Sequence, residues 1–339
     1  DVLLQKLLDA ISRPTLDASR FESIRAEMIR GLRDSVAKRP SSQVLDDLRE
    51  ALMYGEWGEE ALIEALEQLD QEQLQAYGQR FWRQATAEAL IYGNYDRDAV
   101  ETVSAMVAEV IEAEPPPALP PVRVLKLAAS EALQYAVDVP HDDAVVAWYL
   151  QGAGNEWEDR AATALTAQII KTGFFQQLRT EQQLGYVVSA FAWPQMDVPG
   201  LVMLVQSPVA DANAVATAMQ VFMESVESEL EPEQFSRHQA ALVNEILSPD
   251  KNLWERAEFY WQSIAKKQYQ FDGRQALADA IQSFTRESWL AYYNRVFLQH
   301  RHSLQVAAPG KWDKLPGGDH VRYDSAGAIK AGHATYQID

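Results

Sequence analysis

One segment of the sequence places two strong hydrogen-bond donors where a helix is expected to give way to a strand. Residues 173–188 read GFFQQLRTEQQLGYVV, an amphipathic helix that ends in a polar run and turns into a strand at Leu184. Arginine is permanently charged, and a phenol with a pKa of about 10 keeps its proton at neutral pH. Arg179 and Tyr186 can therefore both donate to an oxyanion that develops on an attacked carbonyl group. The plainer alternative is an arginine ion pair beside a tyrosine packed at the protein rim.

The histidines form no recognisable metal-binding motif. The chain has 6 histidines, and none lies in an H-E-x-x-H or H-x-x-E-H pattern that would present two imidazoles one helical turn apart. His300 and His302 are close enough in sequence to chelate a metal from one face of an extended segment, but a solvated loop is the more ordinary interpretation. His141, in the string PHDD, is expected to take part in a turn. The sequence thus predicts no metal ligand in this chain.

Several other classes of chemistry are excluded by residue type. Cysteine is absent, which excludes disulfides, thiol nucleophiles, Cys-ligated zinc and iron–sulfur clusters. No G-x-S-x-G elbow and no glycine-rich phosphate loop occurs. Lys+Arg 30 against Asp+Glu 49 gives a net charge of -19, which argues against nucleic-acid and anionic-membrane partners. No apolar run approaches the roughly 20 residues that a membrane-spanning helix needs.

A proline-rich stretch divides the chain into two segments. Residues 112–122 read EAEPPPALPPV, and a run so dense in proline cannot continue a helix or join a central strand. The 339 residues are enough for two domains. We expect residues 1–113 to form one folded segment, 114–121 an extended linker, and 122–339 the second folded segment.

Hydrophobic periodicity predicts the elements that position the two donors. Before the linker we expect a short strand at 87–92 and helices over 17–32, 41–54, 57–69, 70–84 and 98–111. After it we expect a helix capped by Asn155 and Glu158, further helices over 215–298, and strands at 132–139, 144–150, 186–191, 201–206 and 303–308. The last strand is followed by a glycine-rich tail.

The two segments share a weak internal repeat. The string DASRFESIRAEMIRGL from Asp17 resembles EPEQFSRHQAALVNEI from Glu231, and QEQLQAYGQRF resembles RESWLAYYNRV with Tyr77 on Tyr292. A near-constant offset through helix, helix and strand argues for duplication of a single unit. We therefore predict an α+β fold of two homologous units, each an antiparallel-rich mixed sheet covered by helices. The first unit is expected to be incomplete at its N-terminus.

The motif around the two donors resembles a known family. The string R-T-x-x-Q-L-G-Y-x-V, preceded by a helix ending F-x-x-L, resembles the C-terminal half of the insulinase-like zinc metallopeptidases, the family of pitrilysin and insulysin. The segment ERAEFYWQSIAKKQYQFD at 255–272 is similar to the family's aromatic helix and its Tyr-x-Phe-Asp turn. EALIYGNYD at 88–96 looks like the strand that closes the third domain of the family. The resemblance runs from about residue 17 to residue 310.

The resemblance implies a function as well as a fold. Such enzymes have four homologous domains, arranged as two halves that close around a chamber; residues 1–113 would match the later part of the third domain and 122–339 the fourth. Zinc would be bound by an H-x-x-E-H motif and a further Glu on the N-terminal half, not by this chain. Arg179 and Tyr186 would bind the substrate and polarise its scissile carbonyl or tetrahedral intermediate.

The same resemblance implies the partners and an alternative. Partners would be peptide substrates and the N-terminal half of the same protein, and this chain alone would be an inactive part of a zinc metalloendopeptidase. A pitrilysin-like member would be bacterial and periplasmic. The alternative is a non-catalytic peptide-binding or scaffold subunit homologous to the peptidase. Retention of Arg179 and Tyr186 favours the catalytic interpretation, and an H-x-x-E-H motif upstream in the same protein would decide between the two.

Overall fold

The computed structural model describes residues 2–12, 16–34, 39–111 and 118–338, which fall into two compact units. Unit 1 comprises Asp1–Ser35, Glu59–Pro120 and Asp250–Ala265, and unit 2 comprises Val36–Gly58, Pro121–Pro249 and Lys266–Asp339. Of the predicted linker, residues 114–117 lie outside the described residues, and 118–121 contain neither helix nor strand. The assignment of 1–113 and 122–339 to a third and a fourth peptidase domain stays a prediction.

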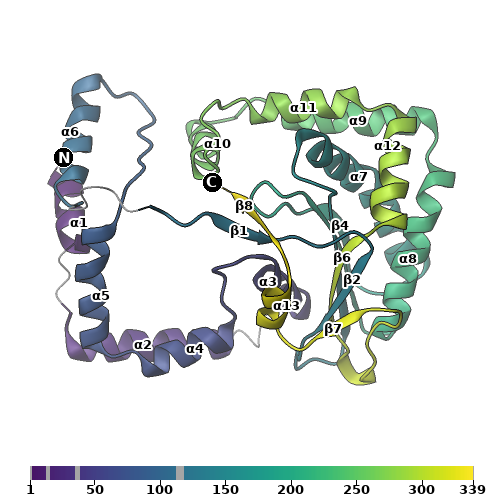
Figure 1. The fold of residues 1–339 in the computed structure, drawn as a ribbon, viewed down its shortest axis with the longest axis horizontal. Helices are drawn as coiled ribbons and strands as arrows, with labels where there is room; N and C mark the ends of the chain where they lie inside the picture. Colours follow the sequence, from purple (N-terminus) through teal and green to yellow (C-terminus); the bar gives the residue numbers. More distant parts are fainter. Residues whose placement is uncertain (1, 13–15, 35–38, 112–117, 339) are drawn as a thin grey trace. The chain divides into compact units, whose positions relative to one another are not determined.

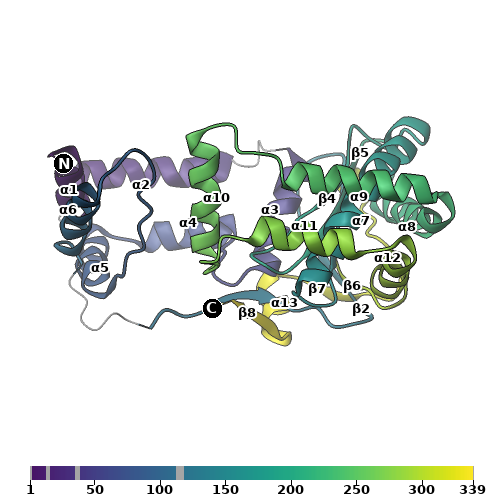
Figure 2. The same ribbon diagram turned by 90° about the horizontal axis from the view of Figure 1, so that it is seen from above.

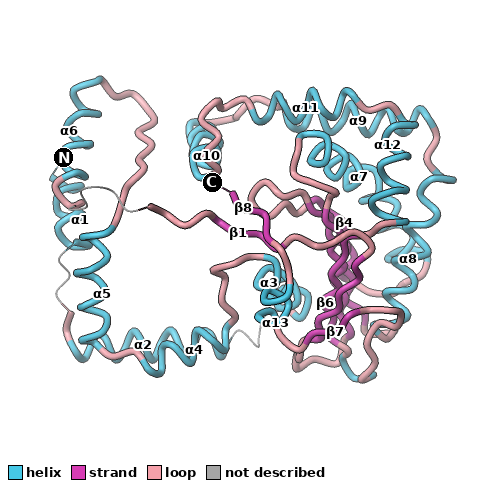
Figure 3. Tube along the Cα trace, viewed as in Figure 1, coloured by secondary structure: helices cyan, strands magenta, loops and turns pink. Residues whose placement is uncertain are grey.

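Unit 1 is helical in the part that the structure describes (Figure 3). Aspartates cap three of its helices by accepting from backbone N–H groups, as expected for this residue type. The strand predicted at 87–92 is wrong, because these residues form neither a helix nor a strand. A strand needs a neighbour to satisfy its backbone groups, and the described residues of this unit supply none. The helices are α1 (Val2–Ser12), α2 (Ala18–Arg33), α4 (Glu59–Gln68), α5 (Gln71–Gln84), α6 (Arg97–Ala108) and α10 (Leu253–Ala265).

Unit 2 is organised around a mixed sheet of six strands in the order β4-β5-β3-β6-β2-β7 (Figure 3). Its central strand β3 pairs antiparallel with β5 and with β6, whereas β2 runs parallel to β6 and β7. Every residue of β3 and β5 is buried, as expected for strands covered on both faces. The strands are β2 (Glu131–Ala136), β3 (Ala144–Gln151), β4 (Val187–Ala192), β5 (Gly200–Ser207), β6 (His302–Ala308) and β7 (Val321–Tyr323). A separate antiparallel pair joins β1 (Val122–Leu125) to β8 (Thr335–Ile338).

Helices cover both faces of this sheet (Figures 1 and 2). One face, with Trp148 and Met203, packs under helices α7 to α9, α11 and α12. The other, with Tyr149 and Val306, packs against α3 and α13. The predicted α+β fold with a helix-covered mixed sheet is confirmed. The helices are α3 (Pro40–Leu52), α7 (Trp157–Phe175), α8 (Ala212–Glu229), α9 (Pro232–Ile246), α11 (Gly273–Ser283), α12 (Arg286–Tyr293) and α13 (Ala326–Gly332).

The helix boundaries follow the internal repeat. Helices α9, α10, α11 and α12 begin about 214 residues after α2, α3, α4 and α5 respectively, in the same order. The repeat partners α3 and α10 each belong to the unit that contains most of the other segment: α3, from before the proline-rich stretch, is in unit 2, and α10, from after it, is in unit 1. We call this the exchange of α3 and α10. The second segment therefore contains the helices of the first in the same sequence order, but one helix of each set lies in the opposite unit.

Candidate functional site

Arg179 lies on a π-helical segment at the end of α7. This segment, η2 (Gln176–Glu181), continues α7 without a break, and the Gln182 N–H donates to the Gln177 carbonyl at 2.9 Å, five residues back. Leu178 is fully buried in the core, whereas Arg179 beside it is exposed. Single π turns inside or at the end of α-helices are frequent at functional sites. The buried Leu178 thus anchors the turn in the core, while Arg179 lies on the exposed side of the same turn.

The start of α7 differs from the prediction. Its N-cap is Glu156, which makes no side-chain capping bond, so the capping box predicted for Asn155 and Glu158 is wrong. The helix begins later than the motif required, and the Asn155 main-chain oxygen instead accepts from Arg160 Nε at 2.7 Å. The guanidinium of Arg160 thus contacts the loop before the helix in place of a cap.

Gly185 joins the π turn to strand β4. A Cβ atom at this position would lie 1.9 Å from the main-chain oxygen of Gln206, so only glycine allows this approach to β5. The Gly185 carbonyl accepts from Arg179 Nη1 at 2.8 Å. The carbonyl of Leu184, the residue before Gly185, accepts from the Ser207 hydroxyl. Arg179 is therefore tied to the residue directly before Tyr186, and the two predicted site residues lie on one short, fixed piece of chain.

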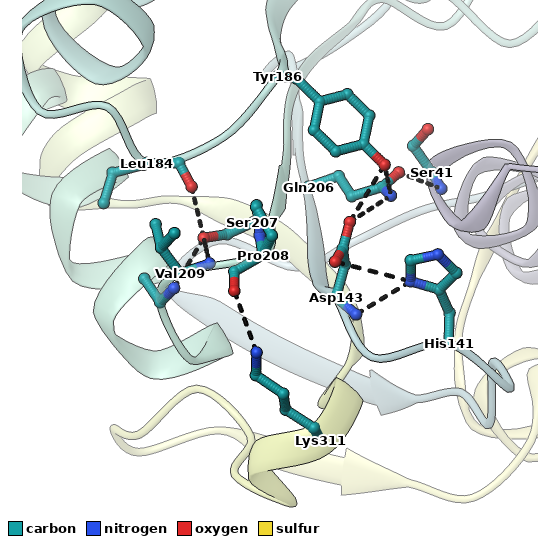
Figure 4. A network of polar contacts seen from close by, with 11 residues as sticks. Ser41, His141, Asp143, Leu184, Tyr186, Gln206, Ser207, Pro208, Val209 and Lys311 are labelled. Carbon is teal, nitrogen blue, oxygen red and sulfur yellow. Dashed lines mark hydrogen bonds and ion pairs between the residues drawn. The ribbon is translucent and has the colours of Figure 1, made fainter.

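The phenol of Tyr186 meets two buried polar side chains (Figure 4). Its ring is 52% exposed, but its hydroxyl donates to Asp143 Oδ2 at 3.1 Å. Gln206 Nε2 donates both to the Tyr186 hydroxyl oxygen, at 2.5 Å, and to Asp143 Oδ2, at 2.9 Å. We refer to Asp143 and Gln206 together as the hydroxyl seat. Gln206 is fully buried and Asp143 nearly so.

Other backbone groups hold the hydroxyl seat in place. The Ser41 N–H at the start of α3 donates to Gln206 Oε1 at 3.2 Å. The Asp143 N–H donates to His141 Nδ1 at 3.0 Å, which is the turn role predicted for this histidine. Gly310 has a positive φ of 60° and lies so close to Asp143 that a Cβ atom would come within 2.6 Å of its carbonyl carbon. The Gln206 side chain is therefore held by α3, and the main chain of Asp143 is held by His141 and by the close approach of Gly310.

The environment of Tyr186 favours its neutral form. Burial of the hydroxyl raises its pKa above the ordinary value, and so do the hydrogen bond to Asp143 and the negative charge of that carboxylate. The positive charge of Arg39 and the hydrogen bond from Gln206 oppose the shift in part. Tyr186 therefore keeps its proton at neutral pH and is chemically a hydrogen-bond donor.

The resemblance implies a zinc ion bound by the N-terminal half of the protein and not by this chain. Among the described residues, no cluster of three or more His, Cys, Asp or Glu side chains could hold a metal ion. His300 Nδ1 lies 3.1 Å from the Ser130 hydroxyl, and His302 Nδ1 lies 2.9 Å from the Leu127 carbonyl, so these imidazoles bind different partners.

In the described part of the chain, no helix combines the length and the apolar character needed to cross a bilayer.

Arg179 and Tyr186, the site residues predicted from the sequence, lie close together in the structure, and their role stays a prediction; the sequence analysis did not predict the hydroxyl seat. A weak signal for Gln206 was present, since it is an amide at the end of the otherwise apolar run LVMLVQ. Asp143 carried no such signal, because aspartate in a PHDD turn is ordinary. The pairing of β5 with both β3 and β4 brings Asp143, Tyr186 and Gln206 together.

Comparisons with known proteins agree with the fold and the motif. A family model described as PQQ synthase PqqF-like, C-terminal lobe domain 4, matches residues 165–261. The chain is 26% identical over 330 residues to the insulin-degrading enzyme of Homo sapiens, covering 91% of this chain and 32% of that protein. It is 23% identical over 316 residues to that of Drosophila melanogaster, covering 90% of this chain and 32% of that protein. The chain thus spans about a third of the length of these relatives.

Solved structures share the whole fold. The crystal structure of pitrilysin matches with a TM-score of 0.91 at 17% identity, covering 100% of this chain and 37% of that one. A structure described as a peptidase M16 inactive domain from Pseudomonas fluorescens matches with a TM-score of 0.63 at 16% identity, covering 95% of this chain and 76% of that one. The family resemblance drawn from the sequence is confirmed, whereas a bacterial origin stays a prediction.

Proposed function

We propose that this chain, which is related to the C-terminal half of the insulinase-like metallopeptidases, supplies two oxyanion donors to a zinc-dependent endopeptidase. Arg179 and Tyr186 would bind the scissile carbonyl of an enclosed peptide and donate hydrogen bonds to its oxygen as negative charge develops. The zinc site would lie on the N-terminal half of the same protein, as the family resemblance implies. On this proposal the isolated chain binds peptide but does not cleave it.

The observation that carries the proposal is the fixed pairing of the two donors. Arg179 is bonded to the carbonyl directly before Tyr186, and the phenol oxygen is held by buried groups while its ring faces solvent. Side chains whose heavy atoms are already held in position need little movement to donate when charge appears, which makes them effective in catalysis. An ordinary surface arginine and tyrosine need neither the close backbone approach at Gly185 nor a buried partner pair.

The substrate class is also a proposal. The relatives are named for the degradation of insulin, a peptide. A neutral phenol and a guanidinium both suit a peptide carbonyl, because that oxygen accepts hydrogen bonds from two directions. Peptide bonds are therefore the substrate that the chemistry of the pair fits.

The first test restores the two halves to one another. Mixing this chain with the N-terminal half should give chelator-sensitive hydrolysis of a quenched fluorescent peptide that neither half gives alone. Tyr186→Phe should lower kcat by about 10²–10³-fold, the cost of losing one oxyanion donor, with a smaller change in KM. Equal kcat for Tyr186→Phe and the unmodified chain would remove Tyr186 from the mechanism.

A non-catalytic binding or scaffold subunit is the second candidate. It is favoured by one comparison, since a structure described as an inactive M16 domain shares this fold. If the folded halves associate, bind peptide and cleave nothing with zinc present, this second function replaces the first. Peptide capture by this chain would then be abolished by Arg179→Ala without any hydrolysis in the unmodified protein.

A further inference from the structure

We propose that the hydroxyl seat is a release device for the hydrogen bond that Tyr186 donates. Gln206 positions the phenol oxygen, and Asp143 accepts the hydrogen bond from the Tyr186 O–H until a substrate oxygen takes its place. This inference rests on the proposed function. It assigns Gln206 a positioning role and makes Asp143 a resting partner that competes with substrate. Neither residue touches the reacting atoms.

In the structure, Tyr186 has no hydrogen left to donate to a substrate. A phenol has a single O–H hydrogen, and here it is directed at Asp143 Oδ2. A hydrogen bond to a charged carboxylate is stronger than one to a neutral acceptor. A peptide carbonyl is neutral in the ground state, so it competes poorly with Asp143. The balance shifts only when negative charge develops on the attacked oxygen, and the donor is then released to the group that needs it.

Gln206 makes this release possible without leaving a buried group unpaired. Its two N–H hydrogens are divided between the Tyr186 oxygen and Asp143 Oδ2, and its own oxygen accepts from the Ser41 N–H. When the phenolic O–H turns away, Asp143 still accepts from Gln206, and the Tyr186 oxygen is still held by the same amide. An unpaired buried carboxylate would be costly, and this arrangement avoids it. No covalent bond breaks in this step, because the phenol keeps its proton and only the O–H direction changes.

Tyr186 and the two residues of the hydroxyl seat differ in burial in a way that fits these roles. Asp143 and Gln206 are buried and fixed by backbone groups, whereas the Tyr186 ring is half exposed. The charged and titratable groups that act on the phenol are Asp143 and Arg39, with His141 Nδ1 lying 3.8 Å from Asp143 Oδ1 behind it. On this proposal the seat stays in place, and only the direction of the Tyr186 O–H changes.

The first experiment measures the Tyr186 pKa in this chain by NMR, using ring-labelled tyrosine and assigning the signal with Tyr186→Phe. Asp143→Asn should lower the pKa, because it removes the carboxylate that raises it. Gln206→Met, which keeps the side-chain length but cannot donate, should raise the pKa, because the Gln206 hydrogen bond lowers it. Asp211→Asn, which removes a charge at the cap of α8, is the matched control and should leave it unchanged. Shifts of the same sign in Asp143→Asn and Gln206→Met would overturn the network.

The second experiment measures kinetics in the full-length protein. Gln206→Met should lower kcat about 10-fold with KM nearly unchanged, since the donor remains but is no longer held in position. Asp143→Asn should keep kcat within about twofold and lower KM, since an amide oxygen competes less strongly for the phenol. Gln305→Met, at a buried glutamine of β6, which is separated from β5 by β3, controls for general disturbance of the sheet. Gln206→Asn, whose shorter side chain cannot reach both partners, replaces Gln206→Met if that variant fails to fold.

The outcomes separate the two proposals. If Tyr186→Phe loses kcat but Gln206→Met does not, the release device is wrong and the oxyanion role of Tyr186 stands. If Tyr186→Phe keeps full kcat, the proposed function of Tyr186 is wrong, whatever the titration shows. A fall in kcat for Asp143→Asn as large as that for Tyr186→Phe would make Asp143 an essential partner and would also overturn the release device.

Discussion

The described part of the chain contains two π turns that end a helix and lead toward a strand, and they differ in the side chains that they expose. The first, η2, continues α7 and is followed by β4; the second, η3 (Asn294–Gln299), continues α12 and is followed by β6. At the fourth residue, η2 has the exposed Arg179 and η3 has the fully buried Phe297. Both turns also bury the residue just before it, Leu178 or Val296.

The polar groups after the two turns behave differently as well. After η3, Arg301 turns back to its own core: its Nε donates to the Phe297 carbonyl at 3.0 Å and its guanidinium lies 5.1 Å from the centre of the Trp148 ring. After η2, Tyr186 faces outward with its hydroxyl on the buried seat. The same π turn thus contributes a buried side chain to the core in η3 and exposes polar side chains in η2. The two turns differ in their fourth residue, Phe297 or Arg179, and in the polar partners of the residues that follow.

The largest contrast is expected in stability. Phe297→Ala should lower the free energy of unfolding by about 3–5 kcal/mol, because it opens a cavity in a fully buried site. Arg179→Ala, at the equivalent position of η2, should lower it by no more than about 1 kcal/mol, the value of one hydrogen bond. Chemical denaturation of the two variants measures both changes. Equal losses would show that the two turns have the same structural role.

The second contrast is in activity and concerns the arginine alone. In the full-length protein Arg179→Ala should lower kcat by about 10²-fold through loss of a charged donor. Arg179→Lys should recover only part of that loss, since lysine keeps the charge but lacks the planar fork that can hold Gly185 and substrate together. His300→Ala, after η3, serves as the control and should leave kcat unchanged. Full activity in Arg179→Ala would assign η2 a purely structural role.

The third contrast compares two glycines of the α7–β4 segment and has the smallest expected effect. Gly185→Ala should lower the free energy of unfolding by about 1–3 kcal/mol, because its Cβ would collide with the rigid backbone of β5. Gly173→Ala in α7 should raise it by about 0.5–1 kcal/mol, since alanine is the better helix former. The Cβ there would meet Phe222 at an ordinary 3.5 Å. A shift in unfolding midpoint of the same sign for both variants would contradict the close approach at Gly185.

Local sequence pattern was enough to place most helices and the helix-to-strand transition that contains Arg179 and Tyr186. The capped, amphipathic stretches predicted helices that the structure places within a few residues, and the helix-to-strand transition at 184–186 is correct. The strand at 87–92 failed because apolar, β-branched residues suit a strand only where a partner strand exists. The glycine-rich tail holds β7, α13 and β8, whose short strands depend on pairing with distant segments.

The hydroxyl seat could not be predicted, since it depends on register between strands far apart in the sequence. Val187 and Val145 both pair with Gln206, so β5 lies between the strand that Tyr186 precedes and the strand that Asp143 precedes. A shift of one residue in either pairing would turn the Gln206 amide away from both. The types and spacing of Arg179 and Tyr186 predict them as donors, and only the register shows what holds the Tyr186 hydroxyl.

The exchange of α3 and α10 has a consequence for how the chain loses its structure. The chain passes from one unit to the other five times, so neither unit corresponds to a continuous stretch of sequence. A fragment beginning after the proline-rich stretch would lack α3, whose Leu48 and Leu52 are fully buried against the sheet, and would lack the Ser41 N–H that holds Gln206. Since α3, Ser41 and the sheet all belong to unit 2, we expect the packing of α3 and the hydroxyl seat to be lost together when unit 2 unfolds.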